Sequence, residues 1–240
     1  MTDHLKFLVL TEDRSSVPVL RRIFKELIDF YQLYLKVEIF FHRGKGSLPK
    51  DLSERPRPQA RSLLELLPAK LRAYAQSSNP STTCLVVSLD ADDDEVDKLY
   101  GQLAHCFDVF SPGFFRVIGI ATEEFEAWLL GDPKAVLRAY PDCDKKLLYK
   151  YPQDEIIGTW EYLAKVILHR AVSSRDSDDY YYIGAYKMEW SERIGRELEL
   201  IENRSPSLQK FVEQIVYCLR RTTGQDIPDF PFKYAATKSN

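Results

Sequence analysis

The feature that most constrains the fold is a short apolar run in the middle of the chain that ends in a group of acids. Residues 82–94 read TTCLVVSLDADDD, so Cys84 to Leu89 is almost unbroken apolar sequence. Such a run is typical of a strand in a parallel sheet that helices cover on both faces. Asp90 and Asp92 follow it directly, at the end of the strand where open α/β sheets build their sites.

These acids have two interpretations that the local sequence leaves open. Carboxylates that repel one another at a strand end are costly unless a cation holds them, which favours a metal site at Asp90 and Asp92. Alternatively, Asp92 or Asp93 caps the helix that follows.

The alternation of elements predicts the fold class. Strands are expected over residues 5–10, 33–41, 84–89 and 114–120, and helices between them over 17–31, 60–76 and 94–107. Right-handed crossovers then give an α/β fold, a parallel sheet flanked by helices. The last third is expected to be a helical elaboration. It has a helix over 154–171 that breaks near Gly158, a polar loop over 173–179, a helix around Trp190 and a last helix that Ser205 caps before Pro206.

Composition excludes some classes of protein. The 240 residues suit one large domain or a core with an elaboration, and a formal net charge of −3 means that nucleic acid would need a local basic patch or metal ions. No apolar run approaches the about 20 residues that span a bilayer, and the first residues lack a signal-peptide pattern. Four cysteines without zinc-ligand spacing favour reduced thiols in the cytoplasm, with Cys84 and Cys218 buried.

Further acids follow the first and fourth expected strands. Glu12 comes after the first strand, and Glu124 and Glu126 come after the fourth. Thr122 can cap a helix there, and acids in its first turn would suit the helix dipole, which is the ordinary explanation for Glu123 and Glu124. Glu126 lies among large apolar side chains, where a carboxylate requires a partner.

The most basic stretch runs from Arg43 to Arg61. Gly44 and Gly46 flank Lys45, so the backbone can approach a phosphate closely, although the spacing is not that of a P-loop. Arg43 and Lys45 are therefore candidate contacts to a nucleic-acid backbone. The alternative is a solvated surface loop.

An acid after the first strand and an Asp-x-Asp after the third is the pattern of TOPRIM domains, which occur in topoisomerases, primases and overcoming-lysogenization-defect nucleases. More specifically, the chain resembles an uncharacterised bacterial TOPRIM-like family, domain of unknown function four-two-seven-six, which is often encoded beside AAA-type ATPases. The blocks that carry the resemblance are LVLTED at 8–13, HRGKGSLPKDL at 42–52, VVSLDADDD at 86–94, EEFEAWLLGD at 123–132, YIGAYK at 182–187 and NRSPSLQKF at 203–211.

The resemblance implies a site for Mg²⁺ or Mn²⁺. Its expected metal ligands are Glu12, Asp90, Asp92, Glu124 and Glu126, and its expected catalytic residues are Glu12 and Lys187. The lysine would neutralise phosphate charge or protonate a leaving oxygen; alternatively, it only pairs with the site acids. Hard oxygen ligands suit Mg²⁺, which stabilises charge on a phosphodiester and activates water.

One position departs from the pattern of the nuclease relatives. Ser16 stands where they place a second acid, four residues after the first. A second ion would then depend on Asp13, Glu124 or Glu126.

These observations support three functions. The first is a Mg²⁺-dependent nuclease, acting on DNA rather than RNA, that serves anti-phage defence with an ATPase; it requires Glu12, Asp90 and Asp92 within reach of one ion. The second is a non-catalytic metal-binding module of an AAA-type ATPase, with a closed or lysine-free site and an apolar patch on the helical third. The third is hydrolysis of nucleotides or small phosphate esters. The expected organisation is a metal-binding core over 1–135 and a helical extension over 136–240, and a homodimer is compatible with it.

Overall fold

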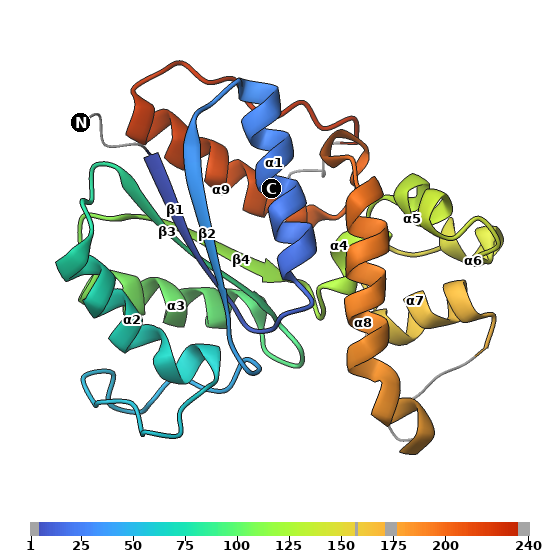
Figure 1. Ribbon diagram of the computed structural model, residues 1–240, viewed down its shortest axis with the longest axis horizontal. Helices are drawn as coiled ribbons and strands as arrows, with labels where there is room; N and C mark the ends of the chain where they lie inside the picture. Colours follow the sequence, from blue (N-terminus) through green and yellow to red (C-terminus); the bar gives the residue numbers. More distant parts are fainter. Residues whose placement is uncertain (1–4, 157, 171–176, 235–240) are drawn as a thin grey trace.

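The computed structural model describes residues 5–156, 158–170 and 177–234. Within them the strands form one parallel sheet in the order β2-β1-β3-β4 (Figure 1). The strands are β1 (Leu5–Thr11), β2 (Leu35–Phe41), β3 (Thr83–Asp90) and β4 (Phe115–Ala121). The predicted α/β class with a parallel sheet is therefore confirmed.

The apolar run of the sequence forms the most buried strand of the sheet. β3 lies between β1 and β4, with Cys84 opposite Phe7 on one side and opposite Phe115 on the other. All eight residues of β3 are buried. Helices cover both faces of the sheet, which explains why this strand has no polar alternation.

Two helices pack on each face of the sheet. Along β1, Phe7 and Val9 join one apolar core, whereas Leu8 and Leu10 join the other. The first core contains α1 (Val17–Tyr31) and α9 (Pro206–Thr223), and the second contains α2 (Leu63–Ser77) and α3 (Val96–Phe110). A helix from near the end of the chain thus completes a layer that the first half of the chain begins.

The remaining helices gather beyond the carboxyl ends of the strands, on the right of Figure 1. They are α4 (Glu126–Leu130), α5 (Pro133–Ala139), α6 (Lys145–Leu148), α7 (Thr159–Leu168), α8 (Ser177–Glu197) and the 3₁₀ turn Leu200–Glu202. Their apolar side chains, among them Trp128, Trp160 and Trp190, continue the core of the α1/α9 face. The predicted helical elaboration is therefore confirmed.

One boundary in this part agrees with the prediction and one does not. The break expected near Gly158 is confirmed, since Gly158 takes a left-handed φ of 86° and α7 begins at Thr159, although residues 154–156 before it are not helical. The loop expected over 173–179 is wrong where it can be compared: residues 171–176 lie outside the described residues, but Ser177–Asp179 begin α8. Serine and aspartate are favoured in the first turn of a helix, so their polarity marked a helix start.

The other local predictions are met. Ser205 caps α9 by accepting a hydrogen bond from Leu208 N, and Pro206 is the first helical residue. All four cysteines are free and buried, Cys84 and Cys218 among them. In the described part of the chain, the helices are too short or too polar to cross a membrane.

Candidate functional site

The predicted site acids come together because parallel strands end at one edge of the sheet. Asp90 is the last residue of β3, Glu12 follows β1, and Glu124 and Glu126 follow β4. The helical group faces this edge, and α8 supplies Lys187 from it. The sheet topology therefore explains how acids so far apart in the sequence become neighbours.

Glu12 and Asp90 are in direct contact. The Asp90 N–H donates a hydrogen bond of 3.2 Å to Glu12 Oε2. Burial raises the pKa of Glu12 to about 7, and the nearby Asp13 and Asp92 carboxylates add to this shift. The side chain of Asp90 is itself buried, and burial followed by the charges of Glu12 and Glu126 raises its pKa well above the ordinary value.

Lys187 is the counter-charge of this group. Its Nζ lies 2.9 Å from Glu124 Oε1 and 3.4 Å from Glu126 Oε2. Burial opposes protonation of Lys187, but the carboxylates of Glu126, Glu124 and Asp90 prevail and raise its pKa. Burial also raises the pKa of Glu126 to about 7, against the charge of Lys187. We call Glu12, Asp90, Glu124, Glu126 and Lys187 the inner cluster.

A second lysine holds the remaining acids. Lys45 Nζ lies 2.6 Å from Asp92 Oδ2 and 2.9 Å from Asp94 Oδ2, and it donates a hydrogen bond of 2.8 Å to Ala91 O. The side chain of Lys45 is 13% exposed, whereas that of Asp92 is 51% exposed. We call Lys45, Asp92 and Asp94 the outer cluster. The structure thus pairs Asp92 with Lys45, while the charge of Asp92 still raises the pKa of Glu12.

The local capping explanations for these acids are wrong. The N-cap residue of α3 is Glu95, so neither Asp92 nor Asp93 caps that helix. Likewise, the helix after β4 begins only at Glu126, with Phe125 as its N-cap, so Thr122 does not cap it. Both helices start several residues after the preceding strand, α3 at Val96 and α4 at Glu126.

Glu123 and Glu124 instead hold the start of a distant helix. Glu123 accepts hydrogen bonds from the backbone of Gly158 and Thr159 and from the Thr159 hydroxyl, and Glu124 Oε2 accepts one of 2.9 Å from Trp160 N. Free N–H groups at a helix N-terminus favour carboxylates. Glu124 therefore bridges α7 and Lys187, a role without any local sequence signal.

Two site residues have an unusual backbone. Asp92 has a φ of 49° and Glu123 a φ of 62°, and Asp92 N donates a hydrogen bond of 2.8 Å to Glu123 O. Left-handed conformations at residues other than glycine concentrate at functional sites. The loops after β3 and β4 are thereby joined in one rigid edge.

Sequence reasoning missed some members of the site. Asp94 belongs to the outer cluster, and only the pairing of the acidic run with the Gly-Lys-Gly segment would have suggested it. Asp13, considered as support for a second ion, has a local role, because it accepts hydrogen bonds from Ser16 N and Ser15 Oγ in the turn before α1. Its charge nevertheless raises the pKa of Glu12 and Asp90.

The fit of a metal ion depends on the donors and on their positions. Among the described residues, no three His, Cys, Asp or Glu side chains form a group that could hold an ion. The donor chemistry does fit, because carboxylate oxygens suit Mg²⁺ and Mn²⁺. Moreover, Glu126 Oε2 is buried and receives no hydrogen bond, although Lys187 lies within ion-pair distance. A divalent cation bound there would compete with Lys187 for Glu126.

Fold and site together define an α/β protein with an acid-and-lysine cluster at the carboxyl edge of its parallel sheet. Comparisons with family models, with characterised proteins and with solved structures gave no significant match. The resemblance to TOPRIM domains therefore stays a prediction, and the function has to be argued from the geometry of this chain.

Proposed function

We propose that this protein is a metal-dependent phosphodiesterase that cuts nucleic acid, and that Glu12, Asp90 and Glu126 would hold Mg²⁺ or Mn²⁺ once their side chains close around the ion and Glu126 leaves Lys187. The observation that carries the proposal is the burial of these three carboxylates at the carboxyl edge of the sheet, with Lys187 paired to Glu126. Buried like charges with shifted pKa values cost folding free energy and are typical of sites that perform chemistry.

The residues of the inner cluster have distinct roles in this proposal. When bound, the cation would stabilise charge on the phosphodiester and activate water. Glu12, fixed by the Asp90 N–H, is positioned to accept a proton. Lys187 keeps its positive charge and can share it with a phosphate oxygen. DNA rather than RNA as substrate, a role in phage defence and a homodimer belong to the same proposal; the free, buried cysteines support a cytoplasmic location.

The test is cleavage of plasmid DNA, single-stranded DNA and RNA with Mg²⁺ or Mn²⁺. Asp90→Asn is expected to abolish cutting, because it removes a carboxylate at the centre of the cluster. Asp93→Asn is the matched control, since Asp93 is an exposed acid of the same loop. Cutting that survives in Asp90→Asn would refute the proposed site.

Metal binding can be measured without activity. Isothermal titration calorimetry with Mn²⁺ is expected to give a binding signal for the wild type and for Asp93→Asn, and none for Asp90→Asn. Equal signals from all three proteins would place the ion elsewhere.

Two observations favour a second candidate function, the non-catalytic module of an AAA-type ATPase. The acids are already paired with Lys187 and Lys45, as expected of a closed site. In addition, a groove of about 960 Å³ lies between α3, β4 and α9, with Tyr100 and Tyr217 on its walls, and could receive a partner. If the isolated chain cuts nothing, the cleavage assay is repeated with an AAA-type ATPase as candidate partner. Cutting would then support the nuclease, and its absence would favour the module.

A further inference from the structure

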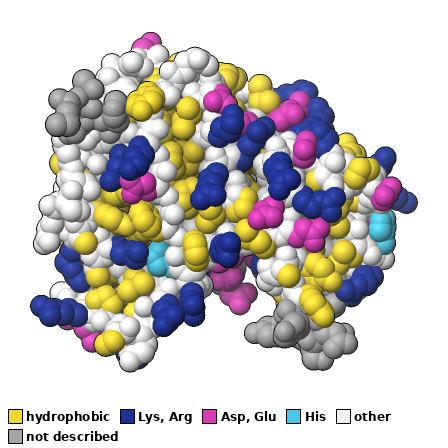
Figure 2. All heavy atoms as spheres, viewed as in Figure 1, with side chains coloured by type: hydrophobic (Ala, Val, Ile, Leu, Met, Phe, Trp, Pro, Cys, Tyr) yellow, Lys and Arg dark blue, Asp and Glu magenta, His cyan; other side chains and the backbone are white. Residues whose placement is uncertain are grey.

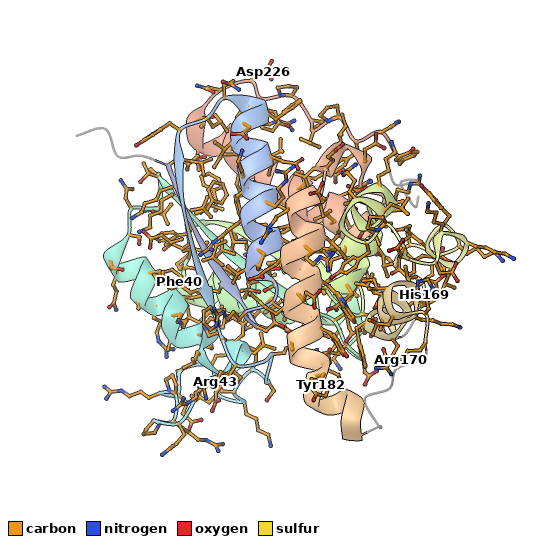
Figure 3. The ribbon with its side chains drawn as sticks, turned by 45° about the vertical axis from the view of Figure 1, so that its right-hand side comes forward. Phe40, Arg43, His169, Arg170, Tyr182 and Asp226 are labelled. Atoms are coloured by element: carbon orange, nitrogen blue, oxygen red, sulfur yellow. The ribbon has the colours of Figure 1, made fainter. Side chains whose placement is uncertain are left out.

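A long loop joins β2 to α2. We call residues 43–62 of this loop the basic loop. It holds six Lys and Arg residues and two acids, whereas the whole chain has a formal net charge of −3. Figure 2 shows Lys and Arg side chains on the lobe that this loop forms at the lower left. Figure 3 shows Arg43 at the base of the lobe, where β2 ends. Positive charge is therefore concentrated in one short segment.

The basic loop is attached to the candidate site at its base. Arg43 N donates to Arg61 O at 2.9 Å, which closes the loop, and Gly44 N donates to Glu12 O at 2.8 Å. The next residue, Lys45, belongs to the outer cluster. The loop thus begins at the acids and projects away from them.

The shape of the basic loop is fixed. Gly46 has a φ of 66°, and a Cβ there would collide with the side chain of Ser62. Arg72 of α2 donates a hydrogen bond of 2.9 Å to Leu52 O. Three prolines restrict the backbone further, Pro49, Pro56 and Pro58. A loop that is ordered in advance loses little conformational entropy when it binds a ligand.

The basic loop encloses a pocket of about 520 Å³ against the start of α2. Lys50, Arg55 and Arg57 line it, together with Glu54 and Glu65. In the described part of the chain, no carboxylate pairs with the three cations. Lys45, by contrast, is held by the outer cluster. The three cations that line the pocket are therefore available to a ligand.

We propose that this pocket binds the phosphate backbone of a single nucleic-acid strand through Lys50, Arg55 and Arg57. The inference rests on the proposed function, because the strand would be held by a loop whose base is bonded to Glu12 of the inner cluster. Arginine and lysine are the usual partners of phosphate oxygens. A pocket of this volume takes one nucleotide unit, whereas a base-paired duplex is too wide to enter it.

The experiment is fluorescence anisotropy of the full chain with a labelled single-stranded oligonucleotide, in EDTA so that nothing is cut. The double variant Arg55→Glu/Arg57→Glu is expected to bind roughly tenfold more weakly. Its affinity should also depend less on salt, with a slope of log affinity against log salt smaller by about 0.7 for each phosphate that the variant no longer binds.

A matched control separates the pocket from overall charge. Arg21→Glu/Arg221→Glu makes the same change in net charge on two exposed arginines of α1 and α9. It should keep the wild-type salt slope and nearly all of the affinity. Equal losses in both double variants, or no loss in either, would overturn the proposal. Thermal melts verify that each variant is folded.

A second variant tests the shape of the pocket without changing charge. Gly46→Ala puts a Cβ where Ser62 lies, so affinity is expected to fall at constant net charge. Inorganic phosphate and a nucleoside triphosphate serve as competitors. If either binds in the pocket while the oligonucleotide does not, the site is one for small phosphates and the proposal is wrong.

The phosphate pocket and the phosphodiesterase can be refuted separately. Binding that depends on Arg55 and Arg57, without cleavage under any metal, would refute the phosphodiesterase and leave the phosphate pocket. Cleavage that depends on Asp90, with unchanged binding and KM in the pocket variant, would refute only the pocket.

Discussion

Asp90 is buried beside two further carboxylates, so we expect its charge to destabilise the protein when no metal is bound. Asp90→Asn should raise the free energy of unfolding by about 1 kcal/mol, or Tm by about 2–4 °C, because the amide has no charge to bury. Thermal denaturation in EDTA, followed by circular dichroism, measures the shift. Asp93→Asn should change little, and a lower Tm for Asp90→Asn would mean that the structure stabilises this charge.

Lys187 is expected to have the opposite effect on stability. Lys187→Ala leaves Glu124 and Glu126 without their counter-charge and should cost about 3 kcal/mol of unfolding free energy. The double variant Lys187→Ala/Glu126→Gln should regain part of that loss, since one unpaired carboxylate is gone. Urea denaturation of the wild type, Lys187→Ala, Glu126→Gln and the double variant tests this coupling, and strictly additive changes would contradict it.

At the residue scale, the sequence predicted which acids lie together when the sheet topology alone brings them together. Glu12, Asp90 and Glu126 meet because parallel strands end at one edge. Asp92 could not be placed, because its left-handed backbone follows from the fold of its loop and its partner Lys45 comes from another loop. Lys187 was expected either beside the metal or paired with the acids, and the structure shows the pairing.

At the scale of elements, α9 protects the open edge of the sheet. Gln214 accepts a hydrogen bond of 3.0 Å from Ile118 N and donates one of 2.9 Å to Ile118 O, as a neighbouring strand would. We predict that Gln214→Ala lowers the free energy of unfolding by about 1–3 kcal/mol. The exposed edge should also promote self-association. Urea denaturation and sedimentation velocity measure the two effects.

A neighbouring residue provides the control for Gln214. Glu213 is exposed on the same helix, so Glu213→Ala should change stability by less than about 0.5 kcal/mol and leave the protein's association unchanged. Self-association of both variants to the same extent would show that the edge of β4 is not the cause.

Most helices and strands could be predicted because apolar periodicity and capping residues are local. The α1 and α9 helices follow from their apolar stripes and from Ser205. The break before α7 could be predicted from Gly158, but not the carboxylates that bind the N-terminus of this helix, since they come from residues 123 and 124. The role of Gln214 has no sequence signature either, because the edge it protects exists only in the folded sheet.

At the scale of the whole molecule, one apolar core joins the sheet and the helical third. Trp128 stacks on Phe211 with ring centroids 5.2 Å apart, and Trp160 and Trp190 belong to the same core. We therefore predict a single unfolding transition in urea, with tryptophan fluorescence and far-UV circular dichroism giving coincident curves. Two separate transitions would show that residues 1–135 and 136–240 unfold independently.

The sequence could not reveal how the last helix completes the sheet. An amphipathic helix shows which of its faces is buried, but not the surface that buries it. Gly119 of β4 approaches the ring of Phe211 so closely that a Cβ would collide with it. The sequence therefore predicted that the helical third packs on the core. It did not predict this contact, because the two residues lie far apart in the sequence.

The burial of all four cysteines has a practical consequence for spectroscopy. Burial raises the pKa of Cys84 and Cys143, and that of Cys106 to about 12, so little of the reactive thiolate forms near neutral pH. Cys218 is equally inaccessible. A single cysteine introduced on the basic loop, for example at Ser53, would therefore accept a maleimide dye in the folded protein without removal of the native thiols.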